Sequence, residues 1–409
     1  MQKKMCRMCE SKSLEMVLDL GFHPPSDAFL DAEELNQPEI FYPLRIVICE
    51  SCGLWQLDYV IDPKILYQKN YPYESSTTKT GRNHYTEMAS TLAKKFAKPG
   101  ELAIDIGSNV GVLLQGLKEH GLKVLGIDPA GNIAAKAIQN GINTIVDFFS
   151  LEIAKKIKKE FGEAKIITGT NVFAHIDNLA DFMRGIDYLL LPKGVFVIEA
   201  PYLLELVKNL EYDTIYHEHL SYLSLKPLSK FLDKFGFEMF GAEKQNIHGG
   251  TIRFLMARKG NYAIAKDVAE FIKIEEDEKI HDVKYIKDWF AQEVKNHKYE
   301  LLKLLLNLKS MGKRISGISA PAKGNTLLNY CGIDAGILEY LTEKAVIKIG
   351  SYTPGSHIKI EPDEKLLDDM PDYALILAWN FADEIMKSMK VFKNRGGKFI
   401  IPIPKPIII

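Results

Sequence analysis

Apolar runs and amphipathic segments alternate along the middle of the chain. Residues 102–106 form a short apolar run with two β-branched isoleucines, residues 112–120 carry apolar side chains at helical spacing, and residues 122–127 form a second apolar run. The stretch 107–111 holds two glycines, which favour a tight turn. This order predicts a strand, a turn, a helix and a strand, the first half of a doubly wound parallel sheet. Such a sheet binds ligands outside the carboxyl ends of its strands.

The same alternation continues on both sides of this unit. The pattern predicts helices over 83–95 and 132–140 and strands over 143–146, 166–168 and 194–199. These segments extend the first sheet, so the central part of the chain is expected to be an α/β domain.

The C-terminal part repeats the pattern after a charged stretch. Residues 266–308 contain no proline or glycine and have helical periodicity, which predicts two bridging helices. A second strand, small-residue turn and helix follow over 314–328, and further strands are expected over 346–349, 373–378 and 398–401. A chain of 409 residues is long enough for two or three such domains.

The turn at 107–111 indicates which ligand the first sheet binds. Its spacing is G-x-x-x-G, whereas a dinucleotide site requires G-x-G-x-x-G so that the backbone can approach a pyrophosphate. Asp105 repels a phosphate but can pair with an ammonium group, and Asp128 is placed to accept hydrogen bonds from ribose hydroxyls. A ribose and a cation without a phosphate indicate S-adenosylmethionine rather than NAD. The alternative is an ordinary strand–helix unit in which Asp105 only caps the helix.

Other polar groups at the same edge of the sheet complete the predicted donor site. The stretch 147–149 (DFF) places an aromatic side chain and an acidic acceptor where an adenine ring would stack, and Asn171 follows the strand at 166–168. The candidate donor-binding residues are Asp105, Gly107, Ser108, Asn109, Gly111, Asp128, Pro129, Asp147, Phe148 and Asn171.

Charge and hydropathy narrow the possible partners. The formal net charge is −1, so bulk electrostatics gives no support for a nucleic-acid partner. The first residues lack the apolar core of a signal peptide, and no window approaches the ~18 apolar residues of a membrane span. We therefore expect a cytoplasmic protein that binds neither nucleic acid nor a membrane.

Four of the five cysteines form two C-x-x-C pairs, Cys6 with Cys9 and Cys49 with Cys52. Two such pairs commonly bring four thiolates around a tetrahedral zinc ion. With four sulfur ligands no position is left for water, so the zinc is expected to be structural. Disulfide bonds are the alternative, which a cytoplasmic location disfavours. Cys331 stands alone in an apolar context and is expected to be buried.

The stretch DTIYHEHLSY is the densest cluster of reactive side chains. Tyr216, His217, Glu218 and His219 are consecutive. Histidine is the commonest general base, and the neighbouring groups can orient it and stabilise an enolate. A metal site is a competing interpretation, although H-E-H lacks the i, i+4 spacing of H-E-x-x-H. A purely structural role, as buried and capping residues, is the third alternative.

Two further turns are candidates for substrate binding. His248, Gly249 and Gly250 offer backbone amides, and Arg253 adds a guanidinium, which suits a phosphate or a sugar hydroxyl. A plain glycine hairpin is the alternative. The second turn carries Ser319, Lys323 and Asn325 and is expected to hold the phosphorylated portion of a substrate, unless it only packs.

A series of motifs runs through the chain in the order paired C-x-x-C, DIGSNVGVLL, NVFAH, DTIYHEHLSY, HGGTIR, SAPAKGNTLLNY, SYTPGSHI and ILAWNFADEI. Together they resemble the three-domain sugar C-methyltransferases, which use S-adenosylmethionine to methylate a carbon of nucleotide-linked deoxyhexoses. The resemblance covers essentially the whole chain. It implies a zinc-binding domain over 1–72, a central Rossmann-like class I methyltransferase domain over 73–262, a helical linker over 263–310 and a C-terminal Rossmann-like substrate-binding domain over 311–409.

The resemblance also implies roles for individual residues. His219 or Glu218 would be the base, Tyr216 and His175 would surround the reacting carbon and oxygen, and Tyr73 would close the site. It further implies structural zinc on the four paired cysteines. One departure is Val110, where the family commonly has an acidic residue; this concerns the donor contacts rather than the fold.

We therefore expect a C-methyltransferase that acts on a nucleotide-diphosphate 4-keto-6-deoxyhexose. His219, or Glu218 with the other as orienter, would remove the C3 proton, Tyr216 and His175 would stabilise the enolate oxygen, and the carbanion would attack the donor methyl. An O-methyltransferase, a nicotinamide-dependent oxidoreductase and a scaffold without activity remain the alternatives. The sequence leaves open whether C3 or C5 is methylated, which nucleotide base the substrate carries, and whether the protein is a monomer or a homodimer.

Overall fold

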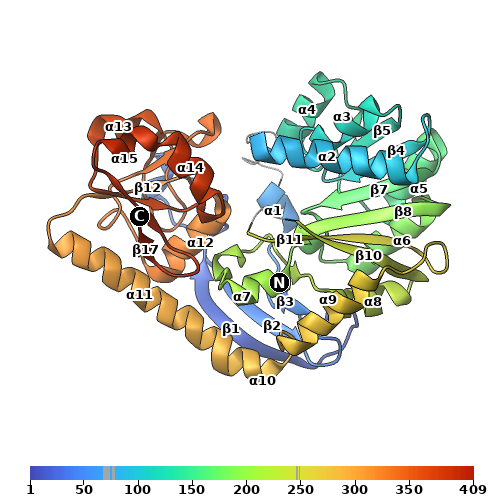
Figure 1. Cartoon of the computed structure of the whole chain (residues 1–409), viewed down its shortest axis with the longest axis horizontal. Helices are drawn as coiled ribbons and strands as arrows, with labels where there is room; N and C mark the ends of the chain where they lie inside the picture. The colour runs from blue at the N-terminus through green and yellow to red at the C-terminus, as the bar shows by residue number, and fades with distance from the viewer. Residues whose placement is uncertain (68–73, 76–78, 246, 248) are drawn as a thin grey trace.

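The computed structural model describes residues 1–67, 74–75, 79–245, 247 and 249–409. Strands of these residues form an N-terminal, a central and a C-terminal sheet. Figure 1 shows the central and C-terminal parts side by side, with the N-terminal sheet below and between them. The α/β fold expected from the sequence is confirmed.

The N-terminal sheet has the order β1-β2-β3-β9 and is antiparallel. Its strands are β1 (Leu14–His23), β2 (Tyr42–Cys49), β3 (Trp55–Leu57) and β9 (Ser221–Tyr222). The fourth strand comes from the central part of the chain and begins two residues after His219. The N-terminal sheet therefore supports the segment that carries the reactive cluster.

The central sheet has the order β10-β11-β8-β7-β4-β5-β6, and the last five of these strands run parallel. Its strands are β4 (Leu102–Ile106), β5 (Lys123–Ile127), β6 (Thr144–Ile145), β7 (Ala164–Thr170), β8 (Leu190–Pro201), β10 (Phe237–Gln245) and β11 (Thr251–Arg258). The chain order reverses at β4, between β5 and β7. That point is where a doubly wound sheet binds its ligand.

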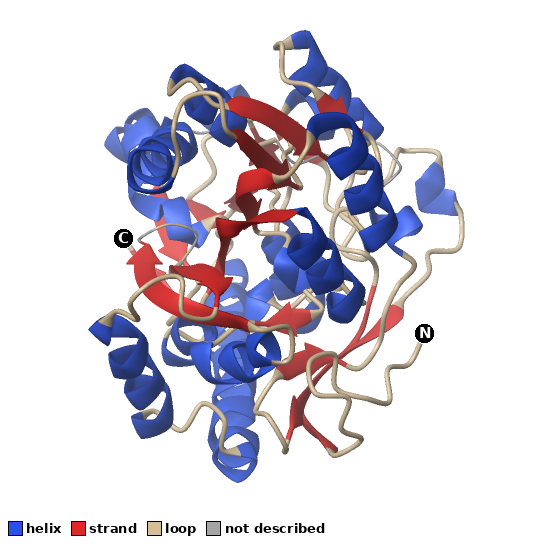
Figure 2. Cartoon of the chain, turned by 90° about the vertical axis from the view of Figure 1, so that its right-hand side faces the viewer, coloured by secondary structure: helices blue, strands red, loops and turns tan. Residues whose placement is uncertain are grey.

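Helices cover both faces of the central sheet because successive strand side chains point to opposite sides. Ala103, Ile166 and Val195 pack with α2 (Lys79–Phe96) and α3 (Val112–Glu119), whereas their neighbours Ile104, Ile167 and Phe196 pack with helices of the other face. Figure 2 shows strands running through the molecule with helices around them. The other helices of this part are α4 (Gly131–Gln139), α5 (Leu151–Phe161), α6 (Leu179–Leu189), α7 (Leu203–Lys208) and α8 (Leu225–Asp233).

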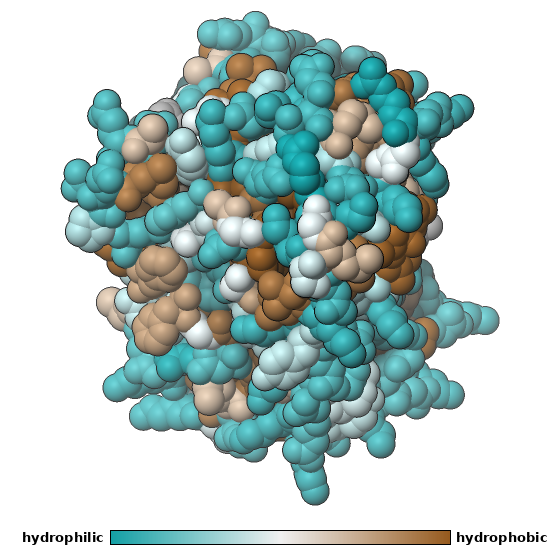
Figure 3. All heavy atoms as spheres, turned by 90° about the vertical axis from the view of Figure 1, so that its left-hand side faces the viewer, coloured by the Kyte–Doolittle hydropathy of each residue, from teal (hydrophilic) through white to brown (hydrophobic). Residues whose placement is uncertain are grey.

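The C-terminal sheet has the order β14-β13-β12-β15-β16-β17 and is parallel except for its last strand. Its strands are β12 (Ile315–Ile318), β13 (Leu341–Glu343), β14 (Ile360–Pro362), β15 (Tyr373–Ile376), β16 (Lys398–Ile401) and β17 (Ile407–Ile408). The helices are α12 (Ala322–Cys331), α13 (Glu364–Asp369), α14 (Ala382–Ser388) and α15 (Lys390–Asn394). Figure 3 faces this side of the molecule, which is largely hydrophilic with separate apolar patches.

The prediction of a strand over 346–349 is wrong. Val346–Lys348 is a short 3-10 helix, and Val346 is 82% exposed. The neighbouring strand of β12 is Leu341–Glu343 instead. An apolar run predicts a buried strand only if a partner strand covers it, and Val346 has its side chain in solvent.

The connection between the two α/β parts is helical, as expected. It consists of α9 (Lys266–Asp277), α10 (Val283–Tyr285), a π-helical turn (Ile286–Phe290) and α11 (Ala291–Ser310). Figure 1 shows α11 passing along the edge of the molecule toward the C-terminal part. Among the described helices, none combines the length and the apolarity that a membrane span requires.

Candidate active site

A cavity of about 800 Å³ lies where the three sheets meet. The N-terminal part contributes Asp27, the central part contributes Asp105 and His219, and the C-terminal part contributes Ser319 and Lys323. The cavity opens at the carboxyl end of the central parallel strands, the position predicted for the ligand.

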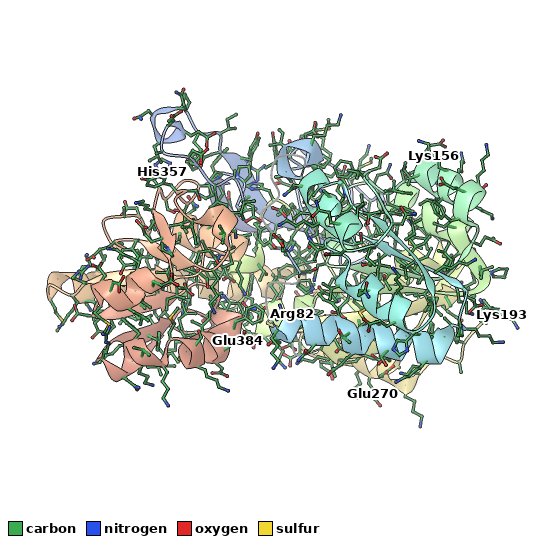
Figure 4. The ribbon with its side chains drawn as sticks, turned by 90° about the horizontal axis from the view of Figure 1, so that it is seen from above. Arg82, Lys156, Lys193, Glu270, His357 and Glu384 are labelled. Atoms are coloured by element: carbon green, nitrogen blue, oxygen red, sulfur yellow. The ribbon has the colours of Figure 1, made fainter. Side chains whose placement is uncertain are left out.

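The rim of the cavity joins the central and C-terminal parts. Thr80 Oγ1, near the start of α2, donates a hydrogen bond to Glu384 Oε2 of α14 at 2.9 Å. Figure 4 shows Arg82 and Glu384 facing each other across this boundary. Glu384 also lines the cavity.

The glycine turn after β4 is tightly packed at the cavity wall. Gly107 and Asn109 have φ of 67° and 51°, and a side chain at Gly107 would collide with Val172. Asp128 accepts hydrogen bonds from the backbone N–H groups of Asn109 at 2.8 Å and Ala130 at 2.9 Å. These bonds fix the Asp128 carboxylate at the edge of the cavity, where it can also accept from a ribose.

Asp105 is a buried carboxyl group on the cavity wall. Thr168 Oγ1 donates a hydrogen bond to Asp105 Oδ1 at 2.6 Å. Burial raises the pKa of Asp105 to about 7, although the hydrogen bond from Thr168 opposes the rise. A cationic ligand group beside Asp105 would stabilise the ionised form.

Most candidate donor-binding residues line this cavity. They are Asp105, Gly107, Ser108, Asn109, Asp128, Pro129, Asp147, Phe148 and Asn171. Gly111 does not line the cavity; it precedes α3 with φ of 83° and lies against Ile142. Val110 packs with Ala130 and Ile133, so its side chain is part of an apolar cluster and not of the cavity wall.

The reactive cluster is formed by two segments that meet at the cavity. Tyr216, Glu218 and His219 come from the loop after η3 (Tyr212–Thr214), and His175 ends η2 (Phe173–His175). The His219 ring centroid lies 4.9 Å from that of His175 and 4.0 Å from that of Tyr216. The sequence places these residues about 40 positions apart, and the fold brings them into contact.

The tautomer of His219 follows from its hydrogen bond. Nδ1 lies 2.8 Å from the carbonyl oxygen of Thr214, and because a carbonyl only accepts, Nδ1 carries the hydrogen. Burial lowers the pKa of His219 to about 4, which leaves the ring neutral near pH 7. Nε2 therefore has a lone pair and can accept a proton.

His175 has a different environment. Its Nδ1 lies 2.8 Å from the hydroxyl of Tyr67, and its Nε2 is buried without a hydrogen-bond partner among the described residues. Burial, and then His219, lower the pKa of His175 well below its usual range. Burial, followed by the charge of Glu218, raises the pKa of Tyr67, so Tyr67 keeps its proton. If the Tyr67 hydroxyl donates to Nδ1, Nε2 carries the hydrogen of the neutral ring.

Tyr67 was not predicted from the sequence. It is the last residue of α1 (Pro63–Tyr67) and stands 108 positions before His175. An aromatic residue at a helix end has many structural uses, so the sequence carries no signal that would select Tyr67.

His217, the remaining member of the YHEH stretch, lies away from the cavity. Its Nε2 contacts the carbonyl oxygen of Pro43 at 3.2 Å.

The C-terminal part presents a second turn to the cavity. Ser319 has φ of 69°, and the N–H of Ala320 donates to Glu343 Oε2 at 2.8 Å, as the N–H of Asn109 donates to Asp128. Ser319 and Lys323 line the cavity, as does Glu343, which the sequence analysis did not select. Burial lowers the pKa of Lys323 to about 8, and its ammonium lies 4.1 Å from the ring centroid of Trp379.

Four substrate-binding candidates lie away from the cavity wall. The Arg253 guanidinium is 2.8 Å from Glu199 Oε2, because a charge buried in β11 requires a partner on the neighbouring strand. Asn325 Nδ2 donates to the carbonyl oxygen of Ser26 at 2.6 Å. Gly249 and Gly250 belong to the hairpin between β10 and β11. His248 and Tyr73 lie outside the described residues.

The four paired cysteines converge. Their Sγ atoms lie within 4.8 Å of one another, with 3.5 Å between Cys6 and Cys52 and 3.4 Å between Cys9 and Cys49. These separations exceed a disulfide bond and approach the ~3.8 Å edge of a tetrahedron of sulfurs around zinc. The residues present therefore fit a zinc ion. Cys331 is buried and apart from this cluster, as expected.

Comparison with known proteins identifies the family. The chain is 33% identical to C-methyltransferase NovU of Streptomyces niveus over 406 residues, which covers 99% of this chain and 96% of that protein. The chain belongs to this C-methyltransferase family. Family models match this C-methyltransferase as a putative zinc binding domain over 6–67, a methyltransferase domain over 81–240 and a C-methyltransferase C-terminal domain over 246–404.

Solved methyltransferase structures resemble part of this C-methyltransferase. One is magnesium protoporphyrin IX methyltransferase of Synechocystis with bound S-adenosylmethionine, at 13% identity, 44% coverage of this chain, 79% of that chain and a TM-score of 0.34. Another is a SAM dependent methyltransferase from Archaeoglobus fulgidus, at 18% identity. The match covers 40% of this chain and 72% of that chain, with a TM-score of 0.33.

These findings confirm the central predictions about this C-methyltransferase. It is an enzyme that transfers a methyl group from S-adenosylmethionine to carbon, and its cofactors are S-adenosylmethionine and zinc. The assignment of individual site residues and the domain boundaries stay predictions.

Proposed function

We propose that this C-methyltransferase methylates the carbon next to the ketone of a nucleotide-diphosphate 4-keto-6-deoxy sugar. One observation carries the proposal: a neutral histidine base, His219, shares one cavity with the glycine turn after β4 and with a second turn that carries Lys323. A base beside a methyl donor suits a carbon acid, which is too weak to react without deprotonation.

The residues of the central part would hold the donor. The Asp105 carboxylate would pair with the ammonium group, Asp128 would accept hydrogen bonds from the ribose hydroxyls, and Phe148 would stack on the adenine. The donor would then share the cavity with the His175–His219 cluster. Holding the methyl donor and the sugar in one cavity makes the reaction between them effectively unimolecular, which lowers the entropic part of the barrier.

His219 acts as the base. Its Nε2 takes the proton from the ring carbon next to the ketone, and the electrons of that C–H bond form the enolate. The enolate carbon attacks the donor methyl, a C–C bond forms, the methyl–sulfur bond breaks, and a neutral thioether leaves. Glu218, also buried on the cavity wall, is the alternative base or the orienting group.

The developing enolate oxygen requires hydrogen-bond donors. His175 Nε2 is buried and without a partner among the described residues, and Tyr216 lines the same wall. With Tyr67 donating to Nδ1, His175 carries its hydrogen on Nε2 and stabilises the oxyanion. No separate acid is required, because the leaving thioether takes no proton.

The second turn binds the diphosphate of the substrate. The backbone at Ser319 precedes the N-terminus of α12, a ten-residue helix whose first N–H groups attract an anion, and Lys323 adds a buried ammonium. This placement leaves the sugar ring between the second turn and the His175–His219 cluster.

Product analysis tests the proposal. The enzyme is incubated with methyl-labelled S-adenosylmethionine and a nucleotide-linked 4-keto-6-deoxyglucose, and the product is examined by mass spectrometry and NMR. We expect one added methyl group, bonded to the ring carbon next to the ketone. A label on oxygen, or no methyl transfer to any nucleotide ketosugar, would overturn the proposal.

A further inference from the structure

Asp27 brings a carboxylate from the N-terminal part into the catalytic cavity. It lies in the loop after β1 and lines the cavity together with residues of the other two parts. Its Oδ1 is buried and has no hydrogen-bond partner in the described part of the chain. Lys348 Nζ lies 4.0 Å from Oδ1, beyond hydrogen-bond distance, and donates instead to the carbonyl oxygen of Ala320 at 2.8 Å.

The loop that carries Asp27 is held in place by α12. Asn325 Nδ2 donates to the carbonyl oxygen of Ser26 at 2.6 Å, and Asn325 is only 1% exposed. The hydroxyls of Ser26 and Thr326 lie 3.5 Å apart. Both contacts hold Ser26, the neighbour of Asp27, against α12. Asn325, expected to touch substrate, is instead positioned to orient the loop of Asp27.

Asp27 lies between the two ends of the proposed substrate site. Its neighbour Lys348 contacts Ala320 of the second turn. Asp27 also raises the pKa of Tyr67, although less than burial, Glu218 and Tyr216 do. Tyr67 in turn contacts His175. A sugar with its diphosphate at the second turn and its reacting carbon at His219 would place its ring opposite Asp27.

We propose that Asp27 accepts a hydrogen bond from a ring hydroxyl of the substrate and thereby selects sugars that carry this hydroxyl over their deoxy analogues. The inference rests on the proposed function. A buried carboxylate oxygen without a partner is an incomplete hydrogen-bonding site, and a substrate that leaves it unpaired binds less well. Discrimination by one such bond is roughly 10- to 100-fold, because the analogue without the hydroxyl leaves a buried oxygen unpaired.

Steady-state kinetics with matched substrates tests this proposal. The wild type, Asp27→Ala and Asp27→Asn are compared on a fully hydroxylated nucleotide 4-keto-6-deoxy sugar and on its 2-deoxy and 3-deoxy analogues. We expect the wild type to prefer the hydroxylated sugar over one analogue by roughly 10- to 100-fold in kcat/KM, and Asp27→Ala to lose that preference. Asp31→Asn, in the exposed part of the same loop, is the control and should keep the wild-type preference.

Donor binding and zinc content show whether each variant is folded. Asp27→Ala should bind S-adenosylhomocysteine as the wild type does; if it does not, Asp27→Asn, which keeps the shape of the side chain, provides the comparison. Equal discrimination in the wild type and a folded Asp27 variant would overturn this inference and leave the proposed function standing. A wild type that methylates no nucleotide ketosugar would overturn both.

Discussion

His219 donates a hydrogen bond from Nδ1 to the carbonyl oxygen of Thr214, five residues earlier in the chain and 2.8 Å away. This bond places the hydrogen of the neutral ring on Nδ1 and leaves the lone pair on Nε2, at the cavity. Burial holds the pKa of His219 near 4, so the basic form is present throughout the neutral range.

The pH dependence of kcat should reflect this low pKa. With the donor and the sugar saturating at each pH, we expect kcat to stay constant from pH 8 down to about 5 and to fall only as pH approaches 4, where His219 takes up a proton. An acidic limb near the usual histidine pKa of ~6.5 would contradict the environment described for His219.

Donor binding should weaken below neutral pH because Asp105 must ionise to pair with the ammonium group. Its pKa is about 7, so protons compete with the donor at lower pH, and we expect affinity for S-adenosylhomocysteine to fall by up to roughly tenfold per pH unit below that value. Calorimetric titrations between pH 5.5 and 8.5 measure this. Asp105→Asn should bind weakly with no such trend, whereas Asp147→Asn should retain it. A pH-independent wild-type affinity would remove Asp105 from the ammonium site.

Tyr67→Phe should slow the reaction without altering substrate binding. The hydroxyl of Tyr67 contacts His175 Nδ1 at 2.8 Å, and its loss leaves the His175 tautomer undetermined. We expect kcat to fall on the order of 10-fold at nearly constant KM, less than the ~10²-fold cost of removing an oxyanion donor itself. Tyr262→Phe is the control, because that hydroxyl bonds to the carbonyl oxygen of Lys193 away from the cavity. Equal effects of the two substitutions would contradict a role for Tyr67 through His175.

Zinc should stabilise the N-terminal sheet and, through it, the catalytic loop. Cys49→Ser should lose the metal, lower the melting temperature by ~5 °C or more and reduce activity, because β3 pairs with β9 directly after His219. Cys331→Ser should keep one zinc per chain, since Cys331 is buried beside the Tyr212 hydroxyl, 3.6 Å away. Metal analysis and thermal unfolding compare the two. Retention of zinc by Cys49→Ser would contradict the assignment of Cys49 as a zinc ligand.

The convergence of the candidate donor-binding residues on one cavity could largely be predicted from the sequence because their arrangement is local. Gly107 and Asn109 adopt positive φ within five residues of Asp105, and Asp128 directly follows the next strand, β5. Turn chemistry and strand order place these groups whatever the rest of the molecule does. Convergence of the four cysteines also follows from their paired spacing.

The rest of the site depends on contacts between distant segments. Tyr67 and Asp27 reach the cavity only because the N-terminal sheet recruits β9 from the central part and the loop after β1 contacts α12, and neither residue belongs to a recognisable motif. The sequence predicts a substrate role for Arg253 because a guanidinium near glycine amides suits a phosphate or a sugar hydroxyl, whereas in the fold the neighbouring strand supplies Glu199 as its partner. The monomer or homodimer state and the cytoplasmic location stay predictions.

Hydrogen exchange on the substrate tests the central claim most directly. The enzyme is incubated in D₂O with S-adenosylhomocysteine in place of the methyl donor and a nucleotide-linked 4-keto-6-deoxyglucose, and deuterium at the carbon next to the ketone is followed by NMR. We predict exchange with the wild type and with His217→Asn, whose side chain lies away from the cavity, and a loss of at least ~10²-fold with His219→Asn. Exchange at the wild-type rate in His219→Asn, with methyl transfer intact, would contradict the assignment of His219 as the base.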